Sequence, residues 1–376
     1  GFLLFHTRSL PAGQNCAPYH IYMEPEGVCM NRLFRWDQMG LFLLALAAGI
    51  LPFAVPEVCA AALREGLTLC SGPLLLSLFP FLVVSRLLVQ CPESDLLALP
   101  FRLAAWGIGI RTPCAARVLC IGFLGGFAPA ASAAAQAVRT GQLTAEEVDA
   151  LLPACICSGP SFVVLTVGQS LLGSAELGVL LFAAQITANY LTAALLNRFA
   201  GVHSVKPGSA APASPAPPRL DEILADAAIT YCKLCGFILF FRMLAAGAGA
   251  LLPAGAGTLC AILLEVCSGC DLASRTGRWG SLLCCAALSV QGLSVLLQVR
   301  TICPAEISLR PLLAARAVHL PLSVALFWLG STVPVQAVQT FTTLTERVVV
   351  LRRVPLDCAL LAFAVCCITV EELARS

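Results

Sequence analysis

The residue whose type and position point most directly to chemistry is Glu265, in the apolar stretch of residues 261–269. No other charged residue lies within five positions of it on either side. A carboxylate at membrane depth is costly, so it is by default a functional candidate with a partner to be found. Candidate partners are Arg242, Arg316 and a bound cation. His319 lies three residues after Arg316 on the same helical face. The pair either extends toward the membrane interface or braces Glu265, and all three residues are candidates for ion or proton coupling. The alternative is a structural hydrogen bond from Glu265 to the backbone of a broken helix.

Small polar residues interrupt two long apolar runs, residues 151–172 and 279–299. Backbone groups freed at such breaks are tolerated at membrane depth only where protein or a water-filled cavity satisfies them. Secondary transporters bind substrates and ions at breaks of this kind. The alternative is that glycine and serine simply allow close packing of helices. The candidate binding residues at the two breaks are Ser158, Ser161, Gln291, Ser294 and Gln298.

The composition indicates which elements hold these residues. Of the 376 residues, 59% are hydrophobic and 12% are charged, and the mean hydropathy is +0.87. Soluble domains have about 45–50% apolar and about 25% charged residues. The chain is therefore predicted to be an all-α, polytopic membrane protein. At about 20 residues per span, it has room for about eight transmembrane helices. The net charge of +2 is too small to indicate a nucleic-acid partner.

The apolar runs and the segments between them divide the chain into five parts. Residues 1–29 lack any helical or strand period, and Met30 is a plausible start. A Pro/Ala/Ser-rich segment reads as a linker between two membrane halves. The expected parts are an N-terminal tail (1–38), a first membrane half (39–196), the linker (197–219), a second membrane half (220–330), and a loop with a final span (331–376).

The basic residues suggest how the halves cross the membrane. Arginine and lysine gather before residue 39, within residues 86–117, and in the linker, which places all three segments on the cytoplasmic side. These positions agree only if residues 114–138 enter and leave on one face, as a re-entrant hairpin turning at Gly125-Gly126. Residues 258–270 are too short to span and read as a second hairpin. Each half then contains a span, a hairpin, a broken span and a span, in opposite orientations. The sequence thus predicts an inverted repeat.

Other motifs are weaker. Most of the 20 cysteines lie in apolar runs, where a thiol behaves as a small hydrophobe. The two CxxC pairs, Cys232/Cys235 and Cys267/Cys270, are separated by an apolar segment unlike that of a zinc ribbon. The sequence contains no GxSxG, HExxH or P-loop in a supporting context. We therefore predict no metal, no cofactor and no enzymatic activity. Residues 144–147 form a capping box that opens a short surface helix.

An ordered series of motifs over about residues 40–330 resembles the sporulation integral membrane protein YlbJ family. That family is classed with the nucleoside recognition, or Gate, domain, which is similar to part of concentrative nucleoside transporters. The matching segments are GLTLCSGPLLLSLFPF (66–81), GGFAP (125–129), RTGQLTAEE (139–147), CSGPSF (157–162), GFILF (236–240), LEVCSG (264–269), GLSVLLQ (292–298) and ARAVH (315–319).

The resemblance implies two hairpins and two broken helices around a central site, in the cell membrane of a sporulating bacterium. It implies by position that nine residues face this site: Gly125, Gly126, Ser158, Ser161, Glu265, Ser268, Gln291, Ser294 and Gln298. The expected function is transport or sensing of a small solute, coupled to a cation or proton. The alternative is a non-transporting factor that anchors partners during spore envelope assembly. The expected partners are the lipid bilayer, the solute, and a second copy of the chain as an open possibility.

Overall fold

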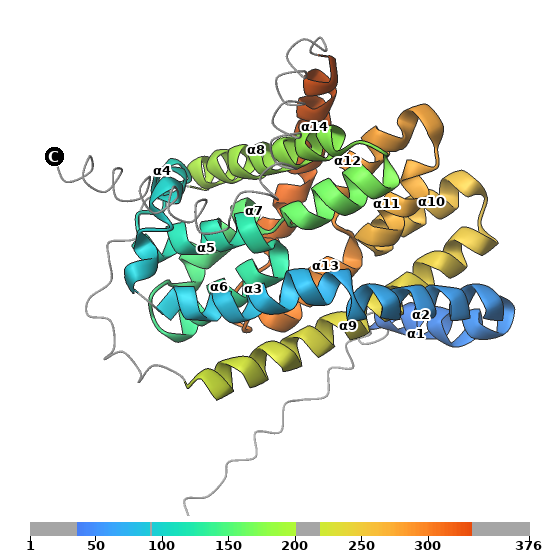
Figure 1. The fold of residues 1–376 in the computed structure, drawn as a ribbon, viewed down its shortest axis with the longest axis horizontal. Helices are drawn as coiled ribbons and strands as arrows, with labels where there is room; N and C mark the ends of the chain where they lie inside the picture. The colour runs from blue at the N-terminus through green and yellow to red at the C-terminus, as the bar shows by residue number, and fades with distance from the viewer. Residues whose placement is uncertain (1–35, 91, 201–218, 333–376) are drawn as a thin grey trace, which may run out of the picture. The chain divides into compact units, whose positions relative to one another are not determined.

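The computed structural model describes residues 36–90, 92–200 and 219–332, and every regular element in these ranges is helical (Figure 1). The all-α prediction is confirmed for this part of the chain. The chain divides into two units, residues 1–46 and 47–376, and all packing described below lies within the second. The elements are α1 (Trp36–Ala54), α2 (Pro56–Ser71), α3 (Pro73–Gln90), η2 (Pro92–Asp95), α4 (Leu99–Gly107), α5 (Pro113–Gly125), α6 (Phe127–Arg139), α7 (Ala145–Cys155), η3 (Ser161–Leu171), α8 (Ala175–Phe199), α9 (Leu220–Leu251), α10 (Ala254–Leu264), α11 (Val266–Ser274), η4 (Gly277–Trp279), α12 (Gly280–Val290), α13 (Gly292–Ile302) and α14 (Arg310–Thr332).

Four helical segments are long and apolar enough to cross a bilayer: α8, α9, residues 277–302 and α14. The pair Phe42–Ala54 and Pro56–Ser71, bent by 111°, would make a fifth if it is one span. The other apolar helices, including α5, η3 and α10, are each shorter than the core of a bilayer requires. The chain therefore has four to five candidate spans in its described residues, and the arrangement with about eight spans stays a prediction.

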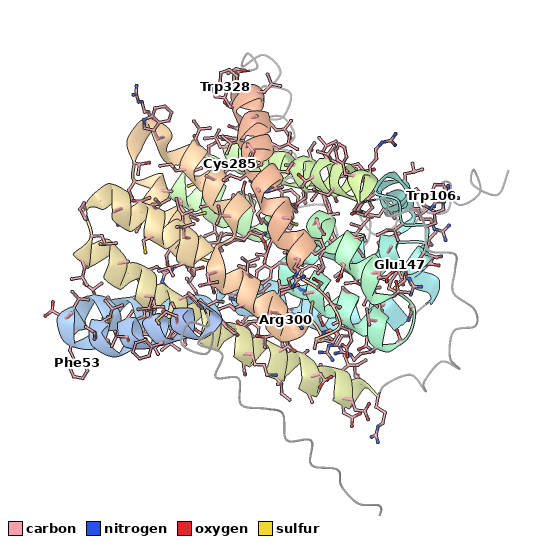
Figure 2. The ribbon with its side chains drawn as sticks, turned by 180° about the vertical axis from the view of Figure 1, so that it is seen from behind. Phe53, Trp106, Glu147, Cys285, Arg300 and Trp328 are labelled. Carbon is pink, nitrogen blue, oxygen red and sulfur yellow. The ribbon has the colours of Figure 1, made fainter. Side chains whose placement is uncertain are left out.

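Large apolar side chains are exposed on α1, α4 and α14. Phe53 is 88% exposed, Trp106 is 56% exposed and Trp328 is 58% exposed. Figure 2 shows these three side chains at the outer surface. Exposed apolar surface of this extent is typical of proteins that contact a membrane.

One apolar run of the sequence, long enough to be expected as a single span, is divided. The apolar run at residues 67–89 forms parts of two helices, because α2 ends at Ser71 and α3 begins at Pro73. Proline suits the first position of a helix, where its missing N–H is not needed, and it disfavours the helical conformation of the residue before it. Gly72 accordingly has a φ of −115° and a ψ of −103°.

The apolar runs of the sequence at residues 177–196, 223–252 and 312–329 correspond closely to α8, α9 and α14. The predicted N-terminal tail to residue 35, the linker from residue 201 and the final span lie outside the described residues.

The core of the first half is built from small residues. The side chains of α6 from Ala130 to Ala137 are almost all alanine, and most are fully buried. Small residues allow helices to approach closely. On α5, a Cβ at Gly122 would come within 2.7 Å of the carbonyl oxygen of Cys155 in α7. The sequence thus packs α5, α6 and α7 tightly together and fixes the position of the turn between α5 and α6.

Candidate functional site

Two helix pairs turn back at single non-helical residues. Between α5 and α6 the turn is at Gly126, with φ 82° and ψ −165°, a conformation open essentially to glycine alone. Between α10 and α11 it is at Glu265, in an extended conformation with φ −153° and ψ 127°. In both cases the two helices pack against each other. The predicted turn at Gly125-Gly126 is confirmed, and Glu265 lies at the second turn.

The first turn lies against the first helix break. Residues 156–159 are non-helical between α7 and η3, which is a π-helix. A Cβ on Gly126 would lie 2.7 Å from the backbone nitrogen of Gly159. The turn and the break therefore touch backbone to backbone, a contact that only glycine permits.

The second turn lies against the second helix break in the same manner. Gln291, between α12 and α13, and Gly292, the first residue of α13, have φ values of 62° and 72°. A Cβ on Gly292 would lie 2.9 Å from the nitrogen of Glu265 and from the carbonyl carbon and oxygen of Leu264. Each half of the chain thus packs a hairpin turn onto a helix break.

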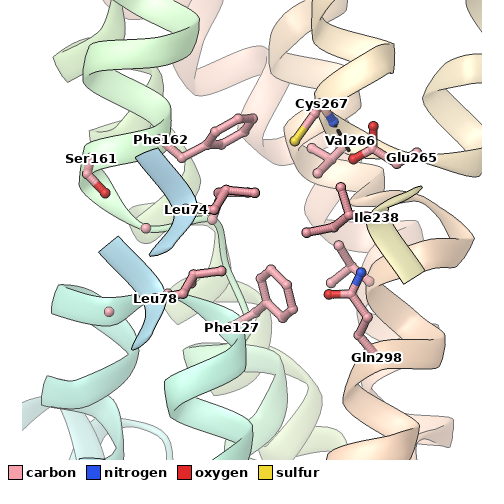
Figure 3. A pocket seen from close by; sticks show the side chains of 15 residues that line it. Leu74, Leu78, Phe127, Ser161, Phe162, Ile238, Glu265, Val266, Cys267 and Gln298 are labelled. Carbon is pink, nitrogen blue, oxygen red and sulfur yellow. Dashed lines mark hydrogen bonds between the residues drawn. The ribbon is translucent and has the colours of Figure 1, made fainter. Parts of the chain in front are cut away.

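A cavity of about 60 Å³ lies where these elements meet (Figure 3). It is large enough for a few water molecules. Six of the nine expected site residues line it, and Ser268, Gln291 and Ser294 do not. The lining residues that were not expected are mainly apolar and come from α3, α6, the first helix break, η3, α9, α11 and α13: Leu74, Leu78, Phe127, Gly159, Phe162, Ile238, Val266, Cys267 and Val295. The six expected residues that line it are Gly125, Gly126, Ser158, Ser161, Glu265 and Gln298.

Glu265 is 2% exposed and caps its own helix. Its Oε1 accepts a hydrogen bond from the nitrogen of Cys267 at 2.7 Å. Its Oε2 accepts from the nitrogen of Ser268 at 2.7 Å and from the hydroxyl of Ser268 at 2.8 Å. A carboxylate at a helix N-terminus satisfies free N–H groups and is favoured by the helix dipole. A carboxylate offers about four acceptor positions. Three are used here, which leaves about one, on Oε1, for a further donor or cation.

The three side chains expected near Glu265, those of Arg242, Arg316 and His319, make their hydrogen bonds elsewhere. The guanidinium of Arg242 pairs with Glu65 at 2.7 Å. Arg316 donates instead to the carbonyl oxygen of Ile156 at 2.7 Å, and His319 contacts the carbonyl oxygen of Gln185 at 3.2 Å. The expectation that Arg316 and His319 brace Glu265 is therefore corrected. Arg316 is drawn to a carbonyl that the first helix break has freed from helical bonding.

The two helix breaks are joined through this same carbonyl. Gln291, at the second break, also donates to the oxygen of Ile156, at 3.3 Å. Arg316 makes a second, longer bond of 3.4 Å to the carbonyl of Ser289, just before the second break. One cation thus satisfies backbone groups at both breaks. Among the ion pairs of the described residues, Arg316 has no acidic partner.

Polar side chains of α8 join helices in the same region. Gln185 donates to the carbonyl of Cys285 at 3.1 Å and to the hydroxyl of Ser289 at 3.0 Å. On α13, the amide of Gln298 donates to Ser294 at 2.9 Å, which explains why Ser294 faces its own helix rather than the cavity.

No group of three or more His, Cys, Asp or Glu residues in the described ranges could hold a metal ion. Cys232 and Cys235 lie on α9, and Cys267 and Cys270 lie on α11. The cavity at the two turns offers one carboxylate, hydroxyls, an amide and apolar walls. This set suits hydrogen bonding to a small solute or contact with a single cation.

Comparison with known protein families, with curated proteins and with solved structures finds no match to this chain.

Proposed function

We propose that this chain is a membrane protein with a permease-like core, which moves or senses a small solute through the cavity between the two helix turns. The observation that carries the proposal is the repeated contact of a hairpin turn with a helix break, at Gly126 with Gly159 and at Glu265 with Gly292. Irregular backbone in a transporter gathers around the substrate site, where free N–H and C=O groups serve the ligand.

The finer architecture is part of this proposal. The hairpins α5–α6 and α10–α11 enter the bilayer without crossing it, and the two halves form an inverted repeat with about eight spans. The matching sequence of elements in each half supports this arrangement. The YlbJ-like motifs support a role in sporulation in the cell membrane of a spore-forming bacterium. The turn at Gly126 and the break before Ser161 both lie within these motifs.

Glu265 is the proposed coupling residue. It is buried, it lines the cavity, and its hydrogen bonds leave about one acceptor position. A cation or proton held there would change the charge that the solute meets. The small cavity favours a solute of a few heavy atoms in the conformation described, because drug-sized ligands occupy about 300–1,000 Å³.

The test is an osmotic swelling assay on proteoliposomes that contain the full chain. Urea, glycine, ribose and uridine form a series of increasing size, and each is added at several pH values. We expect permeation of the smaller solutes, and a changed pH profile in Glu265→Gln. Glu57→Gln, at an exposed position of α2, is the matched control and should behave as the wild type. No permeation of any solute would refute the transport proposal. A profile of Glu265→Gln that equals the wild type at every pH would refute coupling at Glu265.

A second candidate is the non-transporting membrane factor that anchors partners during spore envelope assembly. The observation in its favour is that Glu265 accepts three hydrogen bonds from the first residues of α11, as a purely structural cap would. In this case Ser161→Ala and Gln298→Ala should leave function in spore formation intact. Substitutions within residues 197–219 or 344–355 should abolish it. The reverse pattern would exclude the anchoring role.

A further inference from the structure

A second cavity, of about 210 Å³, lies between α3, α6, α9 and α13. Its charged lining residues are Arg86, Arg139, Lys233 and Asp226. Three cations therefore face one carboxylate. Gln298 lines both this cavity and the one at the helix turns.

The positive charges are only partly neutralised. Arg86 bonds through one terminal nitrogen to Asp226 at 2.5 Å, while its Nε is buried and has no partner among the described residues. Arg139 bonds to the neutral amide oxygen of Gln136, at 3.1 and 3.2 Å. Lys233 is exposed and makes none of the ion pairs in the described part of the chain. The lining carries a surplus of two positive charges, which favours an anion.

Two buried polar oxygen atoms in the same cavity lack partners among the described residues. Ser132, on α6, is 1% exposed, and Gln298 is 2% exposed. Within the described residues, the hydroxyl of Ser132 and the Oε1 of Gln298 make no hydrogen bond. A buried polar group without a partner costs about 1–3 kcal/mol, and native structures rarely contain one without a reason. A ligand that accepts from Ser132 and donates to Gln298 would satisfy both.

The length of α9 places the cavity near the edge of the bilayer. A helix of 32 residues is about 48 Å long, whereas the apolar core of a bilayer is about 30 Å thick. Apart from Arg242, which pairs with Glu65, the charged residues of α9 occur no later than Lys233. The segment from Leu220 to about Lys233 therefore extends out of the apolar layer. Asp226 and Lys233 line the cavity at the depth of the lipid headgroups.

We propose that this cavity binds a phosphate group that also carries a hydroxyl. The hydrogen-bond donors of the cavity come from three helices, α3, α6 and α9, and therefore approach a ligand from several directions. This arrangement suits the tetrahedral oxygens of a phosphate better than the two coplanar oxygens of a carboxylate. Arg86, Arg139 and Lys233 contact the phosphate oxygens, Ser132 donates to one of them, and Gln298 accepts from the hydroxyl. Both the headgroup of an anionic phospholipid and free phosphate have this chemistry, and basic pockets between helices at this depth are typical of lipid headgroup sites. The inference does not depend on transport through the first cavity.

The experiment uses the full chain in nanodiscs of phosphatidylcholine, with or without phosphatidylglycerol, and measures the thermal unfolding midpoint and the lipids retained in native mass spectrometry. Inorganic phosphate is titrated into the phosphatidylcholine sample. Stabilisation by phosphate alone identifies free phosphate, and stabilisation with selective retention of phosphatidylglycerol identifies the lipid. Either result supports the site. The proposal is overturned if the chain is stabilised by neither phosphate nor phosphatidylglycerol.

Variants test the location. Arg139→Gln and Lys233→Gln should each weaken binding about fivefold, and Ser132→Ala should weaken it by up to about tenfold. Ser132 lies among buried alanines, so Ser132→Ala should fold. Its binding can therefore be measured even if a charge variant fails to fold. The control is Arg275→Gln, which removes one exposed cation that lines neither cavity. If Arg275→Gln weakens binding as much as Arg139→Gln, the effect is one of net charge and the proposed site is wrong.

Discussion

Replacing Gly292 with alanine should force the second hairpin turn away from the second helix break. Gly292 has a φ of 72°, and an L-residue in a left-handed conformation costs about 1–2 kcal/mol. The new Cβ would lie 2.9 Å from three backbone atoms of Leu264 and Glu265, none of which can rotate away. Moving backbone to relieve such overpacking costs about 1–3 kcal/mol more. We expect Gly292→Ala to lower the free energy of unfolding by about 2–5 kcal/mol. Alanine also restricts the unfolded chain, which offsets this loss by up to about 1 kcal/mol.

The assay is unfolding of the purified full chain in detergent micelles, followed by helical circular dichroism. The matched control is Gly236→Ala on α9, because a Cβ at Gly236 would meet nothing within 4 Å. Alanine in a helix interior is favoured over glycine by about 0.5–1 kcal/mol, so this control should be slightly stabilising. The reasoning is refuted if Gly292→Ala unfolds like the wild type. It is also refuted if both variants are destabilised equally.

Further variants test other contacts by the same unfolding assay. Arg316→Gln should cost about 1.5–3 kcal/mol, because it removes the charged hydrogen bond to the carbonyl of Ile156; an unchanged stability would show that this bond contributes nothing net. Asn197→Ala should cost about 1–3 kcal/mol, since its amide donates to two backbone carbonyls at 2.9 and 3.1 Å that would be left buried. Glu147→Ala should cost about 1 kcal/mol through loss of the capping box at the start of α7, and a loss below that of exposed Arg275→Gln would contradict the assigned role.

The turns and breaks could be predicted because each has a local signal in the sequence. Gly125-Gly126 and Gln291-Gly292 interrupt apolar runs with glycine, which accepts a positive φ, and the structure breaks the helices there, with positive φ at Gly126 and Gly292. Glu265 stood out as an isolated charge, and it lies at the second turn. The division of the run at 67–89 also had a signal, since Gly72 precedes Pro73 within the run.

The contacts between distant segments could not be predicted in this way. The sequence suggests an ion pair between Arg316 and Glu265. In the structure Arg316 donates to the backbone carbonyl of Ile156, which is 160 residues away in the sequence. A carbonyl released by a helix break has no side-chain signature, so only the fold reveals it as an acceptor. Ser268 was expected in the cavity, but its hydroxyl bonds to Glu265. The cavity walls from Leu74 and Ile238 were missed, because apolar residues on an apolar helix give no sign of which face meets a cavity.

The contacts of Arg316 also have a mechanical consequence. A single side chain on α14 holds the carbonyl of Ile156 at one break and that of Ser289 at the other, and Gln291 adds a direct tie between the breaks. These three hydrogen bonds join the two breaks, so a displacement of one break relative to the other would require breaking them.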